Sequence, residues 1–354
     1  MESAVMTTLS APPDSRDRAI ASWLFGMCGM VMIMVVLGGL TRLTHSGLSM
    51  VDWRPVTGWL PPMNDAEWLA VFDLYKQTPQ FLKLNADMTV DGFKSIFWLE
   101  YIHRLWGRVI GVAFFLPFVY FAVKGWVGKV LGIKLAVMFI LGGAQGVLGW
   151  YMVQSGLIDR PDVSQYRLTA HFGLAVLILG YMFWVAMDLW KEGKVRAHYS
   201  TPAGLRGLAT FTVAWIFLTM MSGGFVAGLD AGLTYNTFPL MDGKFIPDGL
   251  FSETPWWINL FENVTTVQFD HRILAETSFV LVVAVWVLSK RADLPPPART
   301  AVHAFAGMAI VQVVLGISTL LLVVPITLAA LHQLGALVLL MTGLWTLFEM
   351  QAQR

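Results

Sequence analysis

Charge is what this 354-residue sequence has least of, because Lys, Arg, Asp and Glu together make up only 13% of it. That is about half the share found in an average soluble domain. A formal net charge of +1, with no basic tail, gives no basis for a nucleic-acid partner. The single cysteine, Cys28, excludes a disulfide framework and a cysteine-ligated metal site. Without close His-x-His or His-Glu-x-x-His spacing, a dedicated zinc or copper site is poorly supported as well.

Apolar residues take the place of the missing charge and form 56% of the chain. A helix of about 20 apolar residues crosses the roughly 30 Å of hydrocarbon in a bilayer. We therefore predict an all-α integral membrane protein that has the lipid bilayer as its surroundings. Its eight transmembrane helices are expected at residues 20–41, 105–124, 131–152, 168–190, 207–229, 273–289, 299–322 and 327–349.

Basic residues predict the orientation of these spans. They gather in the short connections on one side, which the positive-inside rule assigns to the cytoplasm together with both chain termini. The N-terminal residues lack the pattern of a cleavable signal or a mitochondrial transit peptide. We expect a multi-pass protein of the bacterial inner (plasma) membrane. The basic residues are Arg16, Arg18, Lys124, Lys129, Lys134, Lys191, Lys194, Arg196, Arg206, Lys290, Arg291 and Arg299.

An internal repeat divides the spans into two groups of four. Glu100-Tyr-Ile-His103-Arg104 matches Gln268-Phe-Asp-His271-Arg272, and Gln145-Gly-Val-Leu-Gly149 matches Gln312-Val-Val-Leu-Gly316. A parallel repeat of this kind predicts two pseudo-symmetric four-helix bundles related by an axis along the membrane normal. We assign residues 1–19 to a cytoplasmic tail, 20–195 to the N-terminal half and 196–354 to the C-terminal half.

Two repeated pairs of histidines are the candidate ligands, His103 with His171 and His271 with His332. Imidazoles on facing helices of a bundle can bind a haem iron from both sides. We predict one haem in each half, near the outer, periplasmic face. The alternative, that each histidine merely reaches the interface, is weakened by the repetition at matched depth. His198 and His303 are placed on the cytoplasmic side, and His45 at the outer rim.

Glu100 distinguishes the two halves. It precedes His103 by three residues, so both side chains project from one helix face, whereas the equivalent Gln268 cannot exchange a proton. This difference favours chemistry in the first half and a fixed cofactor in the second. The alternative is that Glu100 only caps the amino end of its helix, where the helix dipole favours an anion.

Further residues near the outer ends of the spans are candidate haem contacts. Guanidinium groups pair well with propionates, although arginines there can equally extend to the interface. Glycines let a porphyrin approach the backbone, or simply let helices pack closely. The arginines are Arg42, Arg104, Arg108, Arg167 and Arg272, and the glycines are Gly38, Gly39, Gly107, Gly111, Gly142, Gly143, Gly146, Gly149, Gly223, Gly224 and Gly316.

Three segments resemble the haem A synthase family, in its alphaproteobacterial and mitochondrial branch. They are Glu100-Tyr-Ile-His103-Arg104-Leu-Trp-Gly107-Arg108, the stretch from Gly38 to Met50, and Thr234-Tyr-Asn236-Thr-Phe-Pro239-Leu-Met-Asp-Gly. The resemblance extends over about residues 20–350. It implies an enzyme that oxidises the C8 methyl group of haem O to the formyl group of haem A by successive hydroxylations, for cytochrome c oxidase assembly.

The resemblance also implies roles for the residues. His271 and His332 would hold a permanent haem b, His103 and His171 would bind the substrate haem O, and Glu100 would be the essential carboxylate. A haem O synthase is an expected partner, the external electron carrier is left open, and an oligomer is compatible with the family. Some bacterial relatives carry cysteine pairs in their outer loops, and this chain has none, so no redox role of such cysteines applies.

Two other functions remain open at this point. A two-haem cytochrome b could use the same four histidines to pass electrons from quinol, although such proteins ordinarily place their haems at different depths. A haem carrier would need one exchangeable site and no catalytic carboxylate. The pigments that accompany the purified protein are the cheapest test: we ask whether haem O or haem A accompanies haem b, since haem b alone at both sites would favour the cytochrome.

Overall fold

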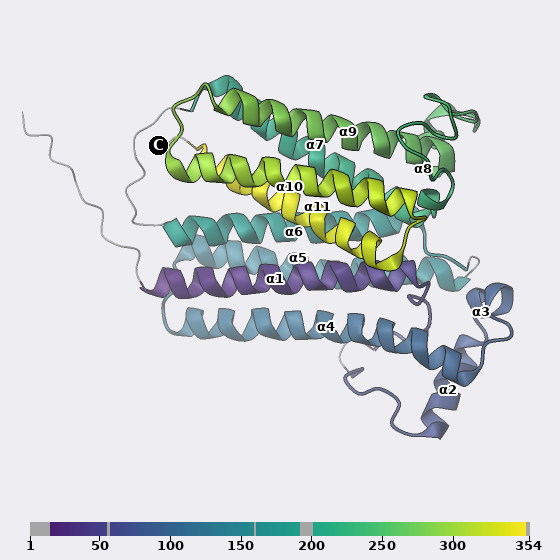
Figure 1. The fold of residues 1–354 in the computed structure, drawn as a ribbon. Helices are drawn as coiled ribbons and strands as arrows, with labels where there is room; N and C mark the ends of the chain where they lie inside the picture. The colour runs from purple at the N-terminus through teal and green to yellow at the C-terminus, as the bar shows by residue number, and fades with distance from the viewer. Residues whose placement is uncertain (1–14, 55–56, 159–160, 192–200, 352–354) are drawn as a thin grey trace, which may run out of the picture.

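The computed structural model describes residues 15–54, 57–158, 161–191 and 201–351. In this part of the chain, eight helices are long and apolar enough to cross a membrane, which confirms the predicted number of spans. They run side by side in Figure 1. Their bounds are α1 Ser15–Leu43, α4 Val90–Val123, α5 Lys129–Ile158, α6 Gln165–Lys191, α7 Ala203–Gly228, α9 Val264–Ser289, α10 Pro296–Leu321 and α11 Ile326–Glu349.

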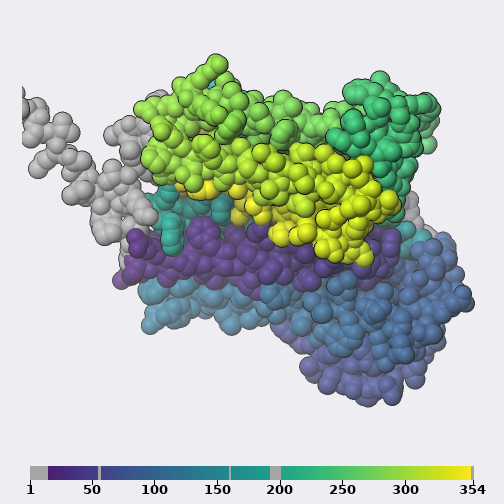
Figure 2. Space-filling model, in the orientation of Figure 1, coloured from purple at the N-terminus to yellow at the C-terminus, as the bar shows by residue number. Residues whose placement is uncertain are grey.

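The long helices form two groups with the same pattern of neighbours. In the first group, α1 and α5 each pack against α4 and α6. In the second, α7 and α10 each pack against α9 and α11. The groups meet where α6 contacts α7 and α11, and where α1 contacts α11. Figure 2 shows the C-terminal helices, green to yellow, lying along one side of α1.

The core lies where α1, α6 and α11 meet, and it is apolar throughout. Leu24 of α1, Leu179 of α6 and Leu337 of α11 are completely buried there. By contrast, α4 and α5 expose apolar side chains such as Leu116 and Ile140. That distribution suits a bilayer, in which close packing between helices and contact with lipid replace the hydrophobic effect of water.

Two helices begin earlier than the spans predicted at 105 and 273. Thr89 caps α4 by accepting the amide of Gly92 at 3.3 Å, and Asn263 caps α9 by accepting the amide of Thr266 at 2.9 Å. The first turn of α4 carries Asp91, and α9 begins with polar residues that are followed by Asp270, His271 and Arg272, so an apolar run starts only later in both helices. His103 therefore does not open its helix but lies about 20 Å along it, at 1.5 Å per residue.

Several short helices lie in the loops at one end of the bundle, which we call the loop end (Figure 1). α1 begins and α11 ends at the opposite end. The sequence analysis did not predict these elements, because they are shorter than a membrane span. They are α2 Asp65–Tyr75, α3 Pro79–Leu84 and α8 Asn259–Glu262, with the 3-10 turns η1 Ala231–Leu233 and η2 Trp256–Ile258.

An aromatic cluster holds α2 against the first turns of α4. Asn64 caps α2 by accepting the amide of Glu67 at 3.0 Å, while the Glu67 carboxylate accepts the amide of Met63 at 2.7 Å. This arrangement is a variant of the capping box, in which Glu67 accepts the amide of the residue before the N-cap. The helix then buries one face on α4. The buried members of the cluster are Trp68, Phe72, Tyr75, Phe93, Phe97 and Tyr101.

Candidate functional site

Each group of helices presents one pair of histidines, from its second and fourth membrane helices. His103 of α4 lies near His171 of α6, and His271 of α9 lies near His332 of α11. All four rings are half-buried, so each keeps a surface that a ligand can cover. The pairing is the one that the sequence repeat predicts.

Each of these histidines lies against a glycine of the preceding membrane helix. The closeness is measured by a Cβ placed on the glycine, which would crowd the ring in all four cases. Measured from that added Cβ, the distances are 3.2 Å from position 38 to His103 Nε2, 2.9 Å from position 149 to His171 Cε1, 3.1 Å from position 223 to His271 Cε1 and 3.0 Å from position 316 to His332 Cε1. Four of the glycines singled out in the sequence thus hold space for the candidate ligands.

The hydrogen bond at His271 suits binding of iron through Nε2. His271 Nδ1 lies 2.8 Å from Ser222 Oγ, and a ring that donates from Nδ1 leaves Nε2 for a metal. Gln145 and Gln312 donate to the main-chain carbonyls of His171 and His332, at 2.8 and 3.0 Å. The amide of Gln312 also lies 3.1 Å from His332 Nδ1, to which it can only donate. Two pairs of half-buried imidazoles on packed helices fit the axial ligands of a haem.

Glu100 is buried one turn before His103, and its carboxylate is fully engaged. It accepts hydrogen bonds from Ser49 Oγ at 2.6 Å, from the Met50 amide at 2.8 Å and from Arg104 at 2.5 Å. The proposal that Glu100 caps its helix is wrong, because α4 begins at Val90. Ser49 lies in the stretch from Gly38 to Met50 that carries the family resemblance, and its position in the sequence does not indicate its contact with Glu100.

The equivalent Gln268 has a different environment. Its side-chain amide donates to the Tyr235 carbonyl at 3.0 Å, and its Oε1 is buried with no hydrogen-bond partner among the described residues. A carboxylate at this position would meet a carbonyl instead of the amide and hydroxyl that hold Glu100. The two halves therefore differ in the loop around this position as well as in the residue itself.

The five arginines predicted to contact propionates all donate to backbone carbonyls. Arg104 and Arg272 do so at equivalent places, since Arg104 binds the carbonyls after α1 and Arg272 those after α7. Buried Nε groups of Arg42 and Arg272 have no hydrogen-bond partner among the described residues. The bonds are Arg104 to Met50 at 2.8 Å and Asp52 at 3.1 Å, Arg272 to Tyr235 and Thr237 at 2.8 Å, Arg42 to Gly228 at 3.3 Å, and Arg108 to Arg54 and Arg167 to Tyr151 at 2.7 Å.

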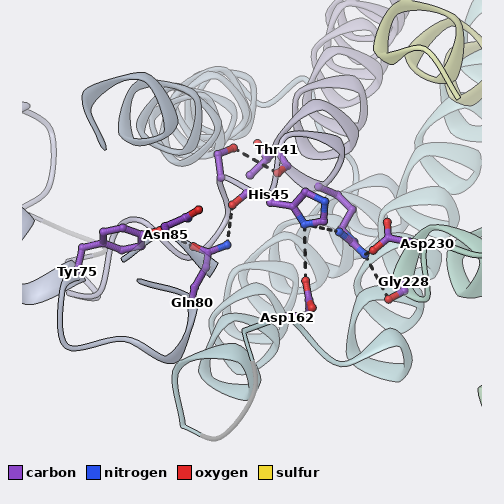
Figure 3. A network of polar contacts seen from close by, with 10 residues as sticks. Thr41, His45, Tyr75, Gln80, Asn85, Asp162, Gly228 and Asp230 are labelled. Carbon is purple, nitrogen blue, oxygen red and sulfur yellow. Dashed lines mark hydrogen bonds and ion pairs between the residues drawn. The ribbon is translucent and has the colours of Figure 1, made fainter. Parts of the chain in front are cut away.

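A polar network ties the two groups of helices together at the loop end (Figure 3). Arg42, at the end of α1, forms an ion pair with Asp230 at 2.8 Å, just after α7. His45 Nδ1 lies 3.2 Å from Arg42 Nη1 and 3.6 Å from the Asp162 carboxylate. The His45 carbonyl accepts a hydrogen bond from Gln80 at 2.8 Å. His45 thus lies at the rim, where it connects three loops.

We expect Asp162 to make stability depend on pH in the acid range. Its interaction with the His45 side chain holds the pKa of Asp162 below its ordinary value of 3.8. A carboxylate whose pKa is depressed by folding stabilises the protein above its unfolded pKa, and this contribution is lost as the pH falls through the folded pKa. Asp162→Asn should therefore lower the thermal unfolding midpoint at neutral pH, and the difference from the parent should vanish in strong acid.

The control is Asp73→Asn, because Asp73 forms only an exposed pair with Lys76 at 2.9 Å, and such pairs contribute little. Scanning calorimetry of the purified protein at several pH values measures both variants. An Asp162→Asn difference that stays constant from neutral pH into strong acid, where the carboxyl is protonated in the folded and the unfolded state, would contradict the assignment.

The other histidines do not join the pairs in the described residues. His303, near the start of α10, has its Nδ1 2.6 Å from the Arg299 carbonyl. His198, Lys194 and Arg196 lie outside the described residues, as do residues 1–14 of the expected tail and the boundary between the halves at 195–196.

Comparison with known proteins identifies relatives along the whole chain. Residues 21–344 match the COX15-CtaA family, described as a cytochrome oxidase assembly protein. The heme A synthase of Nitrosospira multiformis is 52% identical over 359 residues, which is 100% of both chains. That of Paramagnetospirillum magneticum is 50% identical over 98% of this chain and 99% of its own. The heme A synthase COX15 of Bos taurus is 45% identical over 98% of this chain and 85% of its own. The chain belongs to the COX15-CtaA family of cytochrome oxidase assembly proteins.

Proposed function

We propose that the protein is a haem A synthase, which oxidises the C8 methyl group of haem O to the formyl group of haem A for cytochrome c oxidase. The full-length similarity to proteins of that name supports the activity. The structural observation that carries it is the buried carboxylate of Glu100, held by Ser49 and Arg104 one turn from His103. The other histidine pair has Gln268 in that position.

The two pairs are proposed to have different occupants. His271 and His332 hold a resident haem b, which supplies one-electron transfer when it is bound. His103 and His171 bind the substrate haem O beside Glu100. Ser222, which contacts Nδ1 of His271, supports the assignment of the permanent cofactor to the C-terminal pair, because a hydrogen bond from Nδ1 fixes a ligand imidazole.

Glu100 is proposed to assist proton transfer as an external oxidant converts the methyl group to an alcohol and then to an aldehyde. Such general-base assistance needs a carboxylate held within reach of the reacting group. Ser49 and the Met50 amide donate to one carboxylate oxygen, and Arg104 donates to the other. These donors keep the carboxylate in one orientation before the reaction. Arg42 and Arg272 are proposed to contact propionates through their unpaired Nε groups.

The proposed setting is the bacterial inner membrane, with the loop end and both haem sites on the periplasmic side and both termini in the cytoplasm. The same pattern of contacts between neighbouring helices in the two groups supports the division into two pseudo-symmetric halves. A membrane-bound haem O synthase is the proposed source of the substrate. A second copy of the chain is compatible with this arrangement.

Glu100→Gln tests the function directly. The amide keeps the size of the side chain but removes the proton acceptor, so haem A production should fall about 100-fold or more, the usual contribution of a general base. Haem content should be retained, because no histidine is changed. Haem extracted from membranes and separated by chromatography measures both quantities.

The matched control is Gln268→Glu, which leaves Glu100 in place and should not abolish haem A formation. Normal haem A in Glu100→Gln would contradict the proposed role of the carboxylate. The second candidate, an electron-transferring cytochrome b, is favoured only by the likeness of the four glycine–histidine contacts. Haem b as the sole pigment at both sites, with no haem O or haem A, would support the cytochrome instead.

A further inference from the structure

The environments of His103 and His271 differ at the residue that precedes the glycine in contact with each ring. Gly38 of α1 contacts His103, and Gly223 of α7 contacts His271, so these glycines occupy equivalent places. The residue before Gly38 is Leu37, whereas the residue before Gly223 is Ser222. One half therefore has an apolar side chain where the other has a hydroxyl group.

Ser222 fixes the proton of His271. Its Oγ lies 2.7 Å from the Thr219 carbonyl, to which it donates, and 2.8 Å from His271 Nδ1. A hydroxyl group has a single proton to donate, and here that proton is used on Thr219. The oxygen therefore accepts from His271, which places the ring proton on Nδ1 and leaves the Nε2 lone pair free for iron.

His103 has no such partner. The hydrogen bonds of the described residues include none to its imidazole, and Leu37 has no side-chain donor or acceptor to offer. The ring also stands differently, because Gly38 faces its Nε2 at 3.2 Å, whereas Gly223 faces Cε1 of His271 at 3.1 Å. Rotating an imidazole by half a turn about its Cβ–Cγ bond exchanges the positions of Nε2 and Cε1. Nothing polar at Leu37 selects one orientation of His103.

We propose that Ser222 makes the C-terminal haem permanent, and that Leu37 leaves the N-terminal site exchangeable. Ser222 is a positioning residue, because it acts through His271. Hydrogen bonding to the distal nitrogen orients a ligand imidazole and makes it a stronger donor to the metal. An enzyme that keeps one haem and releases another needs this difference between its sites, so the inference rests on the proposed function for the identity of the exchanging haem.

Ser222→Ala in the full-length haem-loaded protein tests the proposal. Transfer of haem to an excess of apomyoglobin measures retention, and a redox titration of the resident haem measures its potential. We expect haem to leave about 10- to 100-fold faster, the usual cost of losing such a partner. The potential should rise, because a weaker donor stabilises ferric iron less. Ser222→Thr should restore both properties, since threonine keeps the hydroxyl group.

Ser289→Ala is the matched control. Ser289 Oγ donates to the Trp286 carbonyl at 2.7 Å on α9, the helix that carries His271, and the hydrogen bonds of the described residues connect it to neither His271 nor Thr219. It should change neither haem retention nor potential. The same changes in both variants would mean that packing, not the ligand contact, is responsible, and would overturn the proposal.

Leu37→Ser is the reciprocal variant, and it keeps the proposal testable if Ser222→Ala does not fold. A hydroxyl group beside His103 should slow the loss of haem from the N-terminal site. Unchanged haem loss in both Ser222→Ala and Leu37→Ser would overturn the inference. Failure of the proposed function would look different, because the unmodified protein would then form no haem A while Ser222→Ala still loosened its haem.

Discussion

Replacing His332 with alanine is expected to remove the resident haem from the purified protein and to abolish haem A formation. In the proposed assignment the variant leaves His271 as the only ligand of the resident haem, and the space of the missing ring beside Gly316 offers no replacement. A haem that has lost one of two protein ligands loses affinity by orders of magnitude. The haem content per protein, measured as the pyridine haemochrome, should fall to the amount bound at the N-terminal pair.

The matched variant is His171→Ala, which makes the same change in the other half. It should also abolish haem A formation, because the substrate site is damaged, but it should keep the resident haem. The comparison is informative because the two histidines have the same kind of neighbours, a glycine on the preceding helix and a glutamine that donates to the main-chain carbonyl. Loss of the resident haem in His171→Ala and its retention in His332→Ala would reverse the assignment of the two sites.

The histidine pairs could be predicted from the sequence because they depend on a repeat. A repeat places equivalent residues in equivalent positions, so four histidines need only one structural explanation. The same reasoning identified Gly149 and Gly316 as candidates, and both lie against a histidine. The number of membrane spans could also be predicted from the sequence, since apolar length alone determines which helices can cross a bilayer.

The loop end could not be predicted in the same way. Its contacts join residues far apart in the sequence, such as Ser49 with Glu100 and Arg42 with Asp230. The helix α2 has a recognisable capping box at Asn64, but its burial depends on aromatic residues of α4 that lie beyond the following loop. Where a contact depends on how loops return to the bundle, neither periodicity nor composition determines it.

The starts of α4 and α9 illustrate a related limit. Apolar length predicts the membrane-spanning part of a helix and not the part that extends beyond the bilayer. Thr89 and Asn263 are ordinary caps, and a search for caps alone would have found them. The polar and charged residues in the first turns of α4 and α9 concealed these helix starts, because such residues interrupt an apolar run. This placed Glu100 too close to the helix start and made a capping role appear possible.

Gly149→Val should abolish haem binding at the N-terminal pair while the protein still folds. A Cβ at this position lies 2.9 Å from His171 Cε1, closer than the two atoms can approach. Without haem the His171 side chain can turn away, so the helices need not separate. With haem the ring must stay in place to reach the iron, and the valine prevents this.

Gly146→Val is the control on the same helix, because a Cβ on Gly146 meets nothing within 4 Å. It introduces the same branched side chain into α5 at the same cost in helix propensity. We expect Gly146→Val to keep both haems and form haem A, and Gly149→Val to keep only the resident haem and form none. Equal haem contents in the two variants, measured on purified protein with matching thermal unfolding midpoints, would show that His171 does not need the space beside Gly149. The clash disappears when the His171 ring moves, so a loss of haem with an unchanged unfolding midpoint identifies His171 as a ligand. A loss of haem together with a lower unfolding midpoint would indicate damage to the packing of α5 and α6.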